Sequence, residues 1–141
     1  LTALEFINVE QLHKKNSALL SFHLSSAIPD HILNRIGITF ILLANEQGEF
    51  VAFGQFYNRL ERIHLARLVV NPDFRGNGVA TSLIDQLISQ GKKQLQLNSA
   101  SLFVLSDNLS AITAYQKSGF IKAQYPTPIP LENCEYMVKT C

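Results

Sequence analysis

Apolar residues in the first half of the chain fall into short runs bounded by polar, turn-forming residues, a pattern typical of β-strands. Runs at residues 38–44, 50–57 and 63–70 are rich in strand-forming residues, and the segment 45–49 reads as a tight turn between the first two. These three runs predict an antiparallel meander. A shorter run at residues 4–9 predicts an additional first strand.

Helical periodicity appears in three places. Leucines recur through residues 11–24, and Pro29 followed by Asp30 starts a second helical pattern that ends at Gly37. The third helix is the most regular, with Gly91 as its expected C-cap, followed by two lysines near the negative end of the helix dipole. Its apolar positions are Val79, Leu83, Ile84, Leu87 and Ile88.

The rest of the second half alternates between strand and helix. Residues 101–105 form a short continuous apolar run, as expected of a strand covered on both faces. A helix is predicted over residues 109–118, closed by Gly119 in a left-handed C′ position and by a hydrophobic contact from Phe120. The last segments, 121–124 and 134–139, predict a further strand pair.

The turn between the strand at 63–70 and the third helix carries the strongest chemical signal. Pro72 ends the strand, and Gly76 and Gly78 permit positive φ and close approach to the backbone. The helix that follows leaves its first N–H groups unpaired at the positive end of its dipole, which makes a site for an anion such as phosphate. A P-loop is excluded because no lysine follows Gly78. A dinucleotide fingerprint is excluded because Thr81 stands where a third glycine is needed and residues 94–105 contain no acidic side chain.

Composition narrows the class of protein. A chain of 141 residues with 47% hydrophobic and 16% charged residues is the size of a single globular domain, residues 1–141. The net charge of +1 gives no case for nucleic acid or a membrane surface. Two cysteines and four scattered histidines predict no metal site. No apolar run approaches the ~18 residues of a membrane span, and no signal-peptide pattern is present, so we expect a cytoplasmic protein.

Two ordered motifs resemble the GNAT superfamily of acyl-CoA-dependent N-acetyltransferases. Arg75, Gly78 and Ala80 occupy the positions of the pyrophosphate loop, Arg/Gln-x-x-Gly-x-Gly/Ala. Residues 108–120 match a second segment, Asn-x-x-Ala-x-x-x-Tyr-x-x-x-Gly-Phe, which follows the next strand as the family order requires. The resemblance covers residues 38–120 well and the two ends of the chain loosely.

The resemblance implies an α/β (α+β) fold with a central mixed, mostly antiparallel sheet, flanked by helices and splayed at the acyl-CoA loop. It implies transfer of an acetyl group from acetyl-CoA (coenzyme A) to a primary amine by direct attack, with no metal. Asn108 equally suits the N-cap of its helix. The implied cofactor-binding residues are Leu68, Val69 and Val70 beside the pantetheine arm, then Arg75, Gly76, Asn77, Gly78, Val79, Ala80 and Thr81 around the pyrophosphate, and Asn108.

Proton handling is the part of the chemistry that the sequence defines least. The resemblance implies that Tyr115 acts as general acid toward the departing thiolate. Many superfamily members carry an acidic residue on the strand before the loop, close to positions held here by Ala66 and Arg67. The remaining candidates for a base are His64, whose ordinary pKa suits neutral pH, and Glu61. Deprotonation relayed by water, without a dedicated base, is equally compatible.

The acceptor and the partners stay open. Arg59, Glu61 and Arg62 are expected in an exposed connection near the amine channel, where they either bind an acidic substrate group or form a solvated turn. The acceptor is a small-molecule or peptide amine, and superfamily members often pair as homodimers through their sheets. The alternative to an enzyme is a non-catalytic acyl-CoA-binding sensor of the same fold, which the departure at Ala66 and Arg67 favours and the retained Tyr115 opposes.

Overall fold

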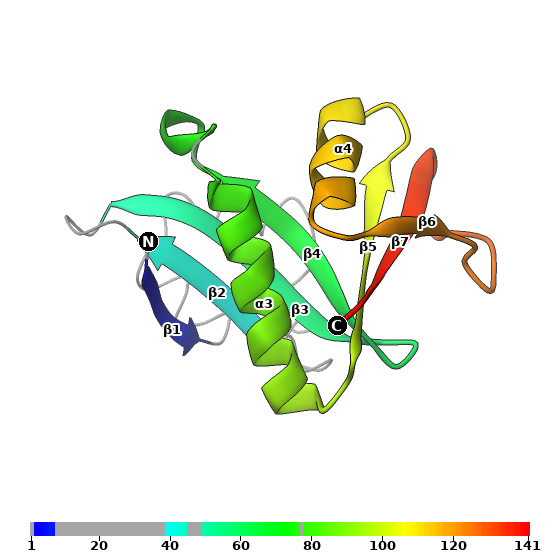
Figure 1. Cartoon of the computed structure of the whole chain (residues 1–141), viewed down its shortest axis with the longest axis horizontal. Coiled ribbons are helices and arrows are strands. Elements are labelled where there is room, and N and C mark those ends of the chain that lie inside the picture. The colour runs from blue at the N-terminus through cyan, green and yellow to red at the C-terminus, as the bar shows by residue number, and fades with distance from the viewer. Residues whose placement is uncertain (1, 8–38, 45–48, 77) are drawn as a thin grey trace.

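The computed structural model describes residues 2–7, 39–44, 49–76 and 78–141 of the chain (Figure 1). Its strands form one sheet in the order β1-β2-β3-β4-β5-β7-β6. Every neighbouring pair is antiparallel except β4 and β5, which are parallel. The elements are β1 (Thr2–Ile7), β2 (Thr39–Ala44), β3 (Phe50–Arg59), β4 (Arg62–Val70), η1 (Pro72–Phe74), α3 (Val79–Leu95), β5 (Ser99–Leu105), α4 (Leu109–Lys117), β6 (Ile121–Ala123) and β7 (Cys134–Thr140).

The antiparallel meander predicted from the sequence is confirmed, because β2 pairs with β3 and β3 with β4. The strand pair at the end of the chain is also confirmed, as β6 and β7. The first strand, Thr2–Ile7, begins two residues before the expected start at residue 4, and the last two residues of the expected strand, 8 and 9, lie outside the described residues. The helices expected over 11–24 and from Pro29 to Gly37 lie outside the described residues. The fold class expected from the resemblance, a mixed and mostly antiparallel sheet flanked by helices, is confirmed.

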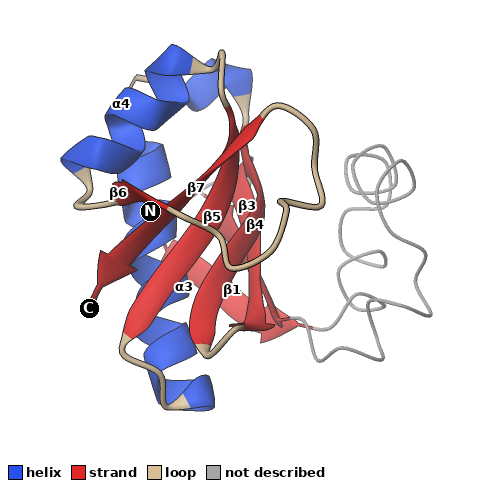
Figure 2. Cartoon of the chain, turned by 90° about the vertical axis from the view of Figure 1, so that its right-hand side faces the viewer, coloured by secondary structure: helices blue, strands red, loops and turns tan. Residues whose placement is uncertain are grey.

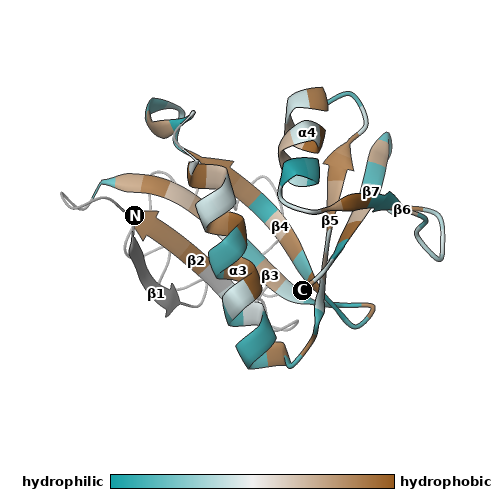
Figure 3. Cartoon of the chain, viewed as in Figure 1, coloured by the Kyte–Doolittle hydropathy of each residue, from teal (hydrophilic) through white to brown (hydrophobic). Residues whose placement is uncertain are grey.

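Helices α3 and α4 lie on the same side of the sheet (Figure 2). The apolar positions predicted for α3 are all buried, and polar bands alternate with apolar ones along the helix in Figure 3. Gly54 on β3 permits close packing of α3, because a Cβ there would stand 2.7 Å from Leu87 Cδ1. None of the helices in the described part of the chain is long and apolar enough to cross a membrane.

Gly91 does not end α3, contrary to the prediction from the sequence. The helix continues to Leu95, and Gln96 takes the left-handed cap position with φ 56°, its N–H donating to the carbonyl of Lys92. Gly91 is buried against β4, where a Cβ would stand 2.5 Å from Ile63 Cγ2. The glycine therefore serves the contact between helix and sheet rather than the cap.

The closure of α4 follows the sequence prediction. Gly119 has φ 100°, its N–H donates to the carbonyl of Gln116, and the N–H of Phe120 donates to the carbonyl of Tyr115. This is the hydrogen-bond pattern of a Schellman motif, with Phe120 buried against the tyrosine ring at a centroid distance of 6.2 Å. The motif fixes the last turn of α4, on which Tyr115 stands.

Candidate active site

The turn after β4 is built by local hydrogen bonds. The Asn71 side chain donates to the carbonyl of Phe50 at 2.8 Å and accepts from the N–H of Asp73 at 3.1 Å, which starts the 3₁₀ turn η1. Gly76 and Gly78 then adopt φ 86° and 73°, and a Cβ on either would meet nothing within 4 Å. Glycine is required at both positions by the backbone conformation and not by lack of space.

The N-terminus of α3 presents free backbone donors. Its first helical hydrogen bond runs from Ser82 N–H to the carbonyl of Gly78, at 3.1 Å. The N–H groups of Val79, Ala80 and Thr81 come before it and have no acceptor within the helix. The N-cap, Gly78, has no side chain to occupy them. This end of α3 is therefore ready to receive an anion.

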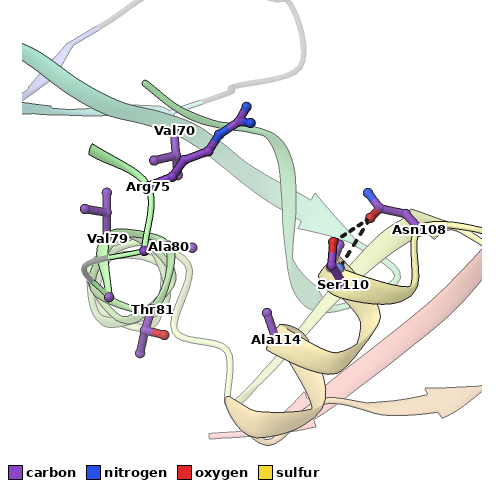
Figure 4. A pocket seen from close by; sticks show the side chains of 11 residues that line it. Val70, Arg75, Val79, Ala80, Thr81, Asn108, Ser110 and Ala114 are labelled. Atoms are coloured by element: carbon purple, nitrogen blue, oxygen red, sulfur yellow. Dashed lines mark hydrogen bonds between the residues drawn. The ribbon is translucent and has the colours of Figure 1, made fainter. Parts of the chain in front are cut away.

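A groove of about 750 Å³ separates this helix end from α4. Figure 4 shows Arg75 on one side of it and Asn108 and Ser110 on the other. None of the described residues that line it carries a carboxylate, so the groove suits a phosphate electrostatically. The lining comprises Val70, Arg75, Gly76, Gly78, Val79, Ala80, Thr81, Asn108, Ser110, Ala111 and Ala114.

Asn108 is the N-cap of α4, one of the two roles that the sequence allowed. Its Oδ1 accepts from the N–H of Ala111 and from Ser110 Oγ, both at 3.3 Å (Figure 4). The same residue borders the groove, so a contact with the cofactor stays a prediction alongside the cap. Asn77 lies outside the described residues.

Strands β4 and β5 part after a short parallel pairing. They pair only where Ile63–Leu65 of β4 lie beside Ala100–Leu102 of β5. Beyond it β4 carries a bulge, because Gln55 pairs with Ala66 and Phe53 with Val69, which leaves two residues opposite Gly54. Arg67 in the bulge has φ 54°, an uncommon conformation for a residue with a side chain.

The splay between the two strands holds a cavity of about 190 Å³. Leu68 borders this cavity and Val70 borders the groove. Val69 borders neither of them, and it pairs with Phe53 of β3. Tyr115 reaches this cavity from α4. Burial raises the pKa of its phenol, so the hydroxyl keeps its proton at neutral pH.

A third cavity, of about 360 Å³, opens on the opposite face of the sheet from α3 and contains His64. The imidazole is 2% exposed and its Nδ1 lies 2.8 Å from Ser101 Oγ. The rings of Phe103 and Tyr57 pack against it, at centroid distances of 4.9 and 5.3 Å. Burial, with a smaller contribution from the charge of Arg59, lowers the pKa of His64 to about 4. The imidazole is neutral at pH 7.

The three cavities are neighbours that share lining residues. Asn108 borders both the groove and the splay cavity. Ala66, Arg67 and Phe103 border both the splay cavity and the His64 cavity. Tyr115 lines the splay cavity, which shares residues with both the site suited to an anion and the cavity lined by polar and aromatic side chains.

Residues 10–120 match the acetyltransferase (GNAT) family over most of the chain. The chain belongs to this family. A relative in Schizosaccharomyces pombe, the UPF0039 protein C11D3.02c, is 31% identical over 83 residues, which cover 58% of this chain. That match covers 54% of the relative, so the chain spans about half the length of the curated relative it matches.

Solved GNAT structures share the fold. The ribosomal-protein-S18-alanine N-acetyltransferase from Escherichia coli superposes with a TM-score of 0.70 at 20% identity, covering 96% of this chain and 92% of that one. A GNAT-family acetyltransferase from Elizabethkingia anophelis, solved with acetyl-CoA bound, gives a TM-score of 0.66 at 15% identity, covering 86% and 88% of the two chains. At these identities the likeness establishes the fold.

The structure separates the two candidate bases. His64 borders the third cavity, whereas Glu61 is exposed in the turn between β3 and β4, with φ 60° and its N–H donating to Asn58 Oδ1 at 3.1 Å. Glu61 borders none of the three cavities. Among the described residues, no group of His, Cys, Asp or Glu side chains is arranged to hold a metal.

The expectation of a solvated turn was wrong for two arginines. Arg59 is the last residue of β3 and its guanidinium packs 5.0 Å from the centre of the Phe103 ring. Arg62 donates to Tyr136 Oη at 3.1 Å. Sequence reasoning also missed Gln55 and Tyr57 as lining residues. Their signal is the strand period, because Gln55, Tyr57 and Arg59 alternate along β3 and so share one face.

Proposed function

We propose that this GNAT-family chain is an acetyl-CoA-dependent N-acetyltransferase that transfers an acetyl group to a primary amine by direct attack. The observation that carries the proposal is the row of three neighbouring cavities, with Tyr115 lining the one that shares residues with both others. One end has the donors for a phosphate-bearing cosubstrate, and the other has room and polar groups for an acceptor. A GNAT-family structure similar to this chain contains acetyl-CoA, which supports the choice of acyl donor.

The groove residues fit the pyrophosphate of coenzyme A. The N–H groups of Val79, Ala80 and Thr81 would hold it, with Gly76 and Gly78 supplying the turn and Arg75 the positive charge. Residues Leu68, Val69 and Val70 lead from the groove along β4 to the splay, and their backbone groups would face the pantetheine arm. Asn108 would contact the cosubstrate where the groove meets the splay.

Acetyl-CoA supplies a thioester whose acyl carbon accepts the amine nitrogen. The N–C bond forms, the C–S bond breaks, the attacking nitrogen gives up one proton, and the sulfur leaves with its electron pair and takes up one proton. Proton transfer from a phenol of pKa about 10 to a thiolate of pKa about 8.5 is uphill by roughly 2 kcal/mol. Because burial raises the pKa of Tyr115 further, its hydroxyl acts chiefly as a hydrogen-bond donor to the developing negative charge on sulfur.

The ammonium proton of the acceptor must leave before attack. A group with a pKa of about 4 binds a proton too weakly at pH 7 to serve as an efficient general base, so we assign His64 to orienting the acceptor through a hydrogen bond. Glu61 lies outside the cavity. Water therefore carries the proton away, which is one of the routes that the sequence left open.

Calorimetric titration with acetyl-CoA, followed by thiol release against a panel of primary amines, tests the proposal. We expect saturable acetyl-CoA binding and thiol release that depends on both the protein and the amine. Absence of acetyl-CoA binding would refute the assignment of the groove. Binding without release for anionic, neutral, cationic and peptide amines would instead indicate an acyl-CoA sensor.

A further inference from the structure

Among the described residues, the lining of the His64 cavity, which would receive the acceptor, contains two guanidinium groups and no carboxylate. The arginines are Arg59 from β3 and Arg67 from β4. Neither forms an ion pair with any other described residue. Charged side chains that are partly withdrawn from water are usually paired, because an uncompensated charge is costly in a medium of low dielectric constant. Two cations that face one cavity and have no ion-pair partner in the described part of the chain are a feature that the transfer reaction alone does not explain.

Arg59 is held in place by neutral groups. Its Nε donates to Tyr125 Oη at 3.0 Å and its Nη1 to Tyr57 Oη at 3.2 Å. The guanidinium also packs 5.0 Å from the ring centre of Phe103 and 5.8 Å from that of Tyr125. These contacts fix the orientation of the group but use two of its five N–H donors, and no described carboxylate compensates its charge.

Arg67 borders both the splay cavity and the His64 cavity. The bulge in β4 places it there, and its Nε is buried without a hydrogen-bond partner among the described residues. Burial lowers the pKa of its guanidinium, but an arginine remains charged at neutral pH. The position beside the thioester, where many family members carry an acid, here carries a cation.

Gln55 adds an independent sign of a missing ligand. Its side chain is fully buried, it borders the same cavity, and neither its Nε2 nor its Oε1 has a hydrogen-bond partner among the described residues. Buried amide groups in native structures are nearly always satisfied, so each exception calls for an explanation. A bound molecule that both accepts and donates hydrogen bonds would satisfy both atoms.

We propose that the acceptor is an amine that also carries a carboxylate, and that Arg59 and Arg67 bind that carboxylate. The inference rests on the proposed transferase function and names its substrate class. A carboxylate matches the planar fork of a guanidinium and compensates its charge. The amide of Gln55 donates to the same carboxylate or accepts from the amine. A polycationic amine, in contrast, brings further positive charge toward two arginines and is disfavoured.

An isosteric series of acceptors tests the proposal: γ-aminobutyrate, its neutral analogue γ-aminobutyramide, and the diamine putrescine. With acetyl-CoA saturating, we expect kcat/KM for thiol release to favour the carboxylate over the carboxamide by about tenfold to a hundredfold, as charge-assisted hydrogen bonds imply. Equal rates, or a preference for the amide or the diamine, would overturn the proposal while leaving the transferase function intact. Faster reaction of aminopropylphosphonate than of γ-aminobutyrate would overturn the choice of a carboxylate.

Variants locate the preference within the cavity. Arg59→Gln and Arg67→Gln should each reduce the ratio of carboxylate to carboxamide rates by about tenfold, and Arg59→Lys should retain part of it. Arg62→Gln is the matched control, because this arginine comes from the same strand as Arg67 and borders none of the three cavities. A ratio that survives both cavity variants would overturn the assignment of the two arginines.

A binding measurement separates this inference from the proposed function. Calorimetry with the two N-acetylated products, γ-acetamidobutyrate and γ-acetamidobutyramide, requires no turnover. We expect the carboxylate to bind at least tenfold more tightly, and this difference to disappear in Arg59→Gln. If no amine is acetylated but the carboxylate still binds preferentially, the transferase function fails and the anion site stands. Equal binding of the two products would refute the anion site whatever the activity.

Discussion

From the burial of His64 we predict a specific loss of folding stability at mildly acidic pH. The imidazole has an ordinary pKa of 6.5 when exposed and a pKa of about 4 in the folded protein, because burial and the charge of Arg59 oppose its protonation. Between these two values the unfolded chain binds a proton that the folded chain does not. Stability is therefore fully present above about pH 6.5 and is lost as the pH falls toward 4.

The magnitude follows from the same two values. Each unit of pKa difference corresponds to about 1.4 kcal/mol. Between about pH 7.5 and about pH 4.5 the contribution of His64 to the free energy of unfolding falls by about 2.5 kcal/mol, a large share of the stability of an ordinary domain. Carboxylates also begin to titrate in this range, so the effect must be isolated by comparison with a variant.

His64→Gln provides that comparison, because glutamine has no titrating group and can still accept from Ser101 Oγ, the partner of the imidazole. Urea unfolding at the two pH values gives the loss of stability for each protein. We expect the wild type to lose about 2.5 kcal/mol more than the variant. Equal losses, or an imidazole that titrates near 6.5 by NMR, would refute the reasoning and restore His64 as a general base.

Four further predictions concern the other parts of the site and fold. Tyr115→Phe should lower kcat by on the order of a hundredfold without changing the calorimetric affinity for acetyl-CoA; an unchanged kcat would remove the tyrosine from its role. Gly78→Val should weaken acetyl-CoA binding at least tenfold at unchanged circular dichroism, since a β-branched residue is strained at φ 73°, and retained affinity would contradict the groove assignment. Gly91→Ala should lower the free energy of unfolding, measured in urea, by about 1–3 kcal/mol, although alanine has the higher helix propensity. The loss should be smaller in an Ile63→Ala background, and a gain in stability would contradict the packing argument. Arg67→Gln should move the rising limb of the pH dependence of kcat/KM to higher pH, and an unmoved limb would show that its charge does not reach the amine.

The local conformations that the sequence predicted correctly are those determined by residues close together in the chain. The end of β4 before Pro72, the positive φ of Gly76 and Gly78, and the closure of α4 at Gly119 are confirmed. Gly91 shows the limit of local reasoning. A glycine near the end of a periodic pattern looks like a cap, but its role here depends on Ile63, a residue of the neighbouring strand.

The His64 cavity could not be predicted because its residues meet only through sheet pairing. Arg59 and Arg67 lie on different strands, and the bulge that directs Arg67 toward the cavity appears only in the register between β3 and β4. The sequence contained a weaker signal, the polar face formed by Gln55, Tyr57 and Arg59 at alternate positions of a strand. This polar face could be assigned to a cavity only with knowledge of which face of the sheet the helices cover.

The charges of Arg59 and Arg67 in the His64 cavity also bear on the absence of an acidic residue at positions 66 and 67. An amine with a pKa near 10.4 is neutral in only about one molecule in 2,500 at pH 7, and a carboxylate beside it would stabilise the ammonium form further. A guanidinium has the opposite effect, and each unit by which it lowers the amine pKa raises the neutral fraction about tenfold. Arg67 borders both the splay cavity and the His64 cavity, so on the proposed function its charge would lie near the amine that loses a proton. On the proposed function, Arg59 and Arg67 bind the carboxylate of the acceptor and favour its neutral amine together. The reaction then needs no dedicated base, and His64 can remain neutral.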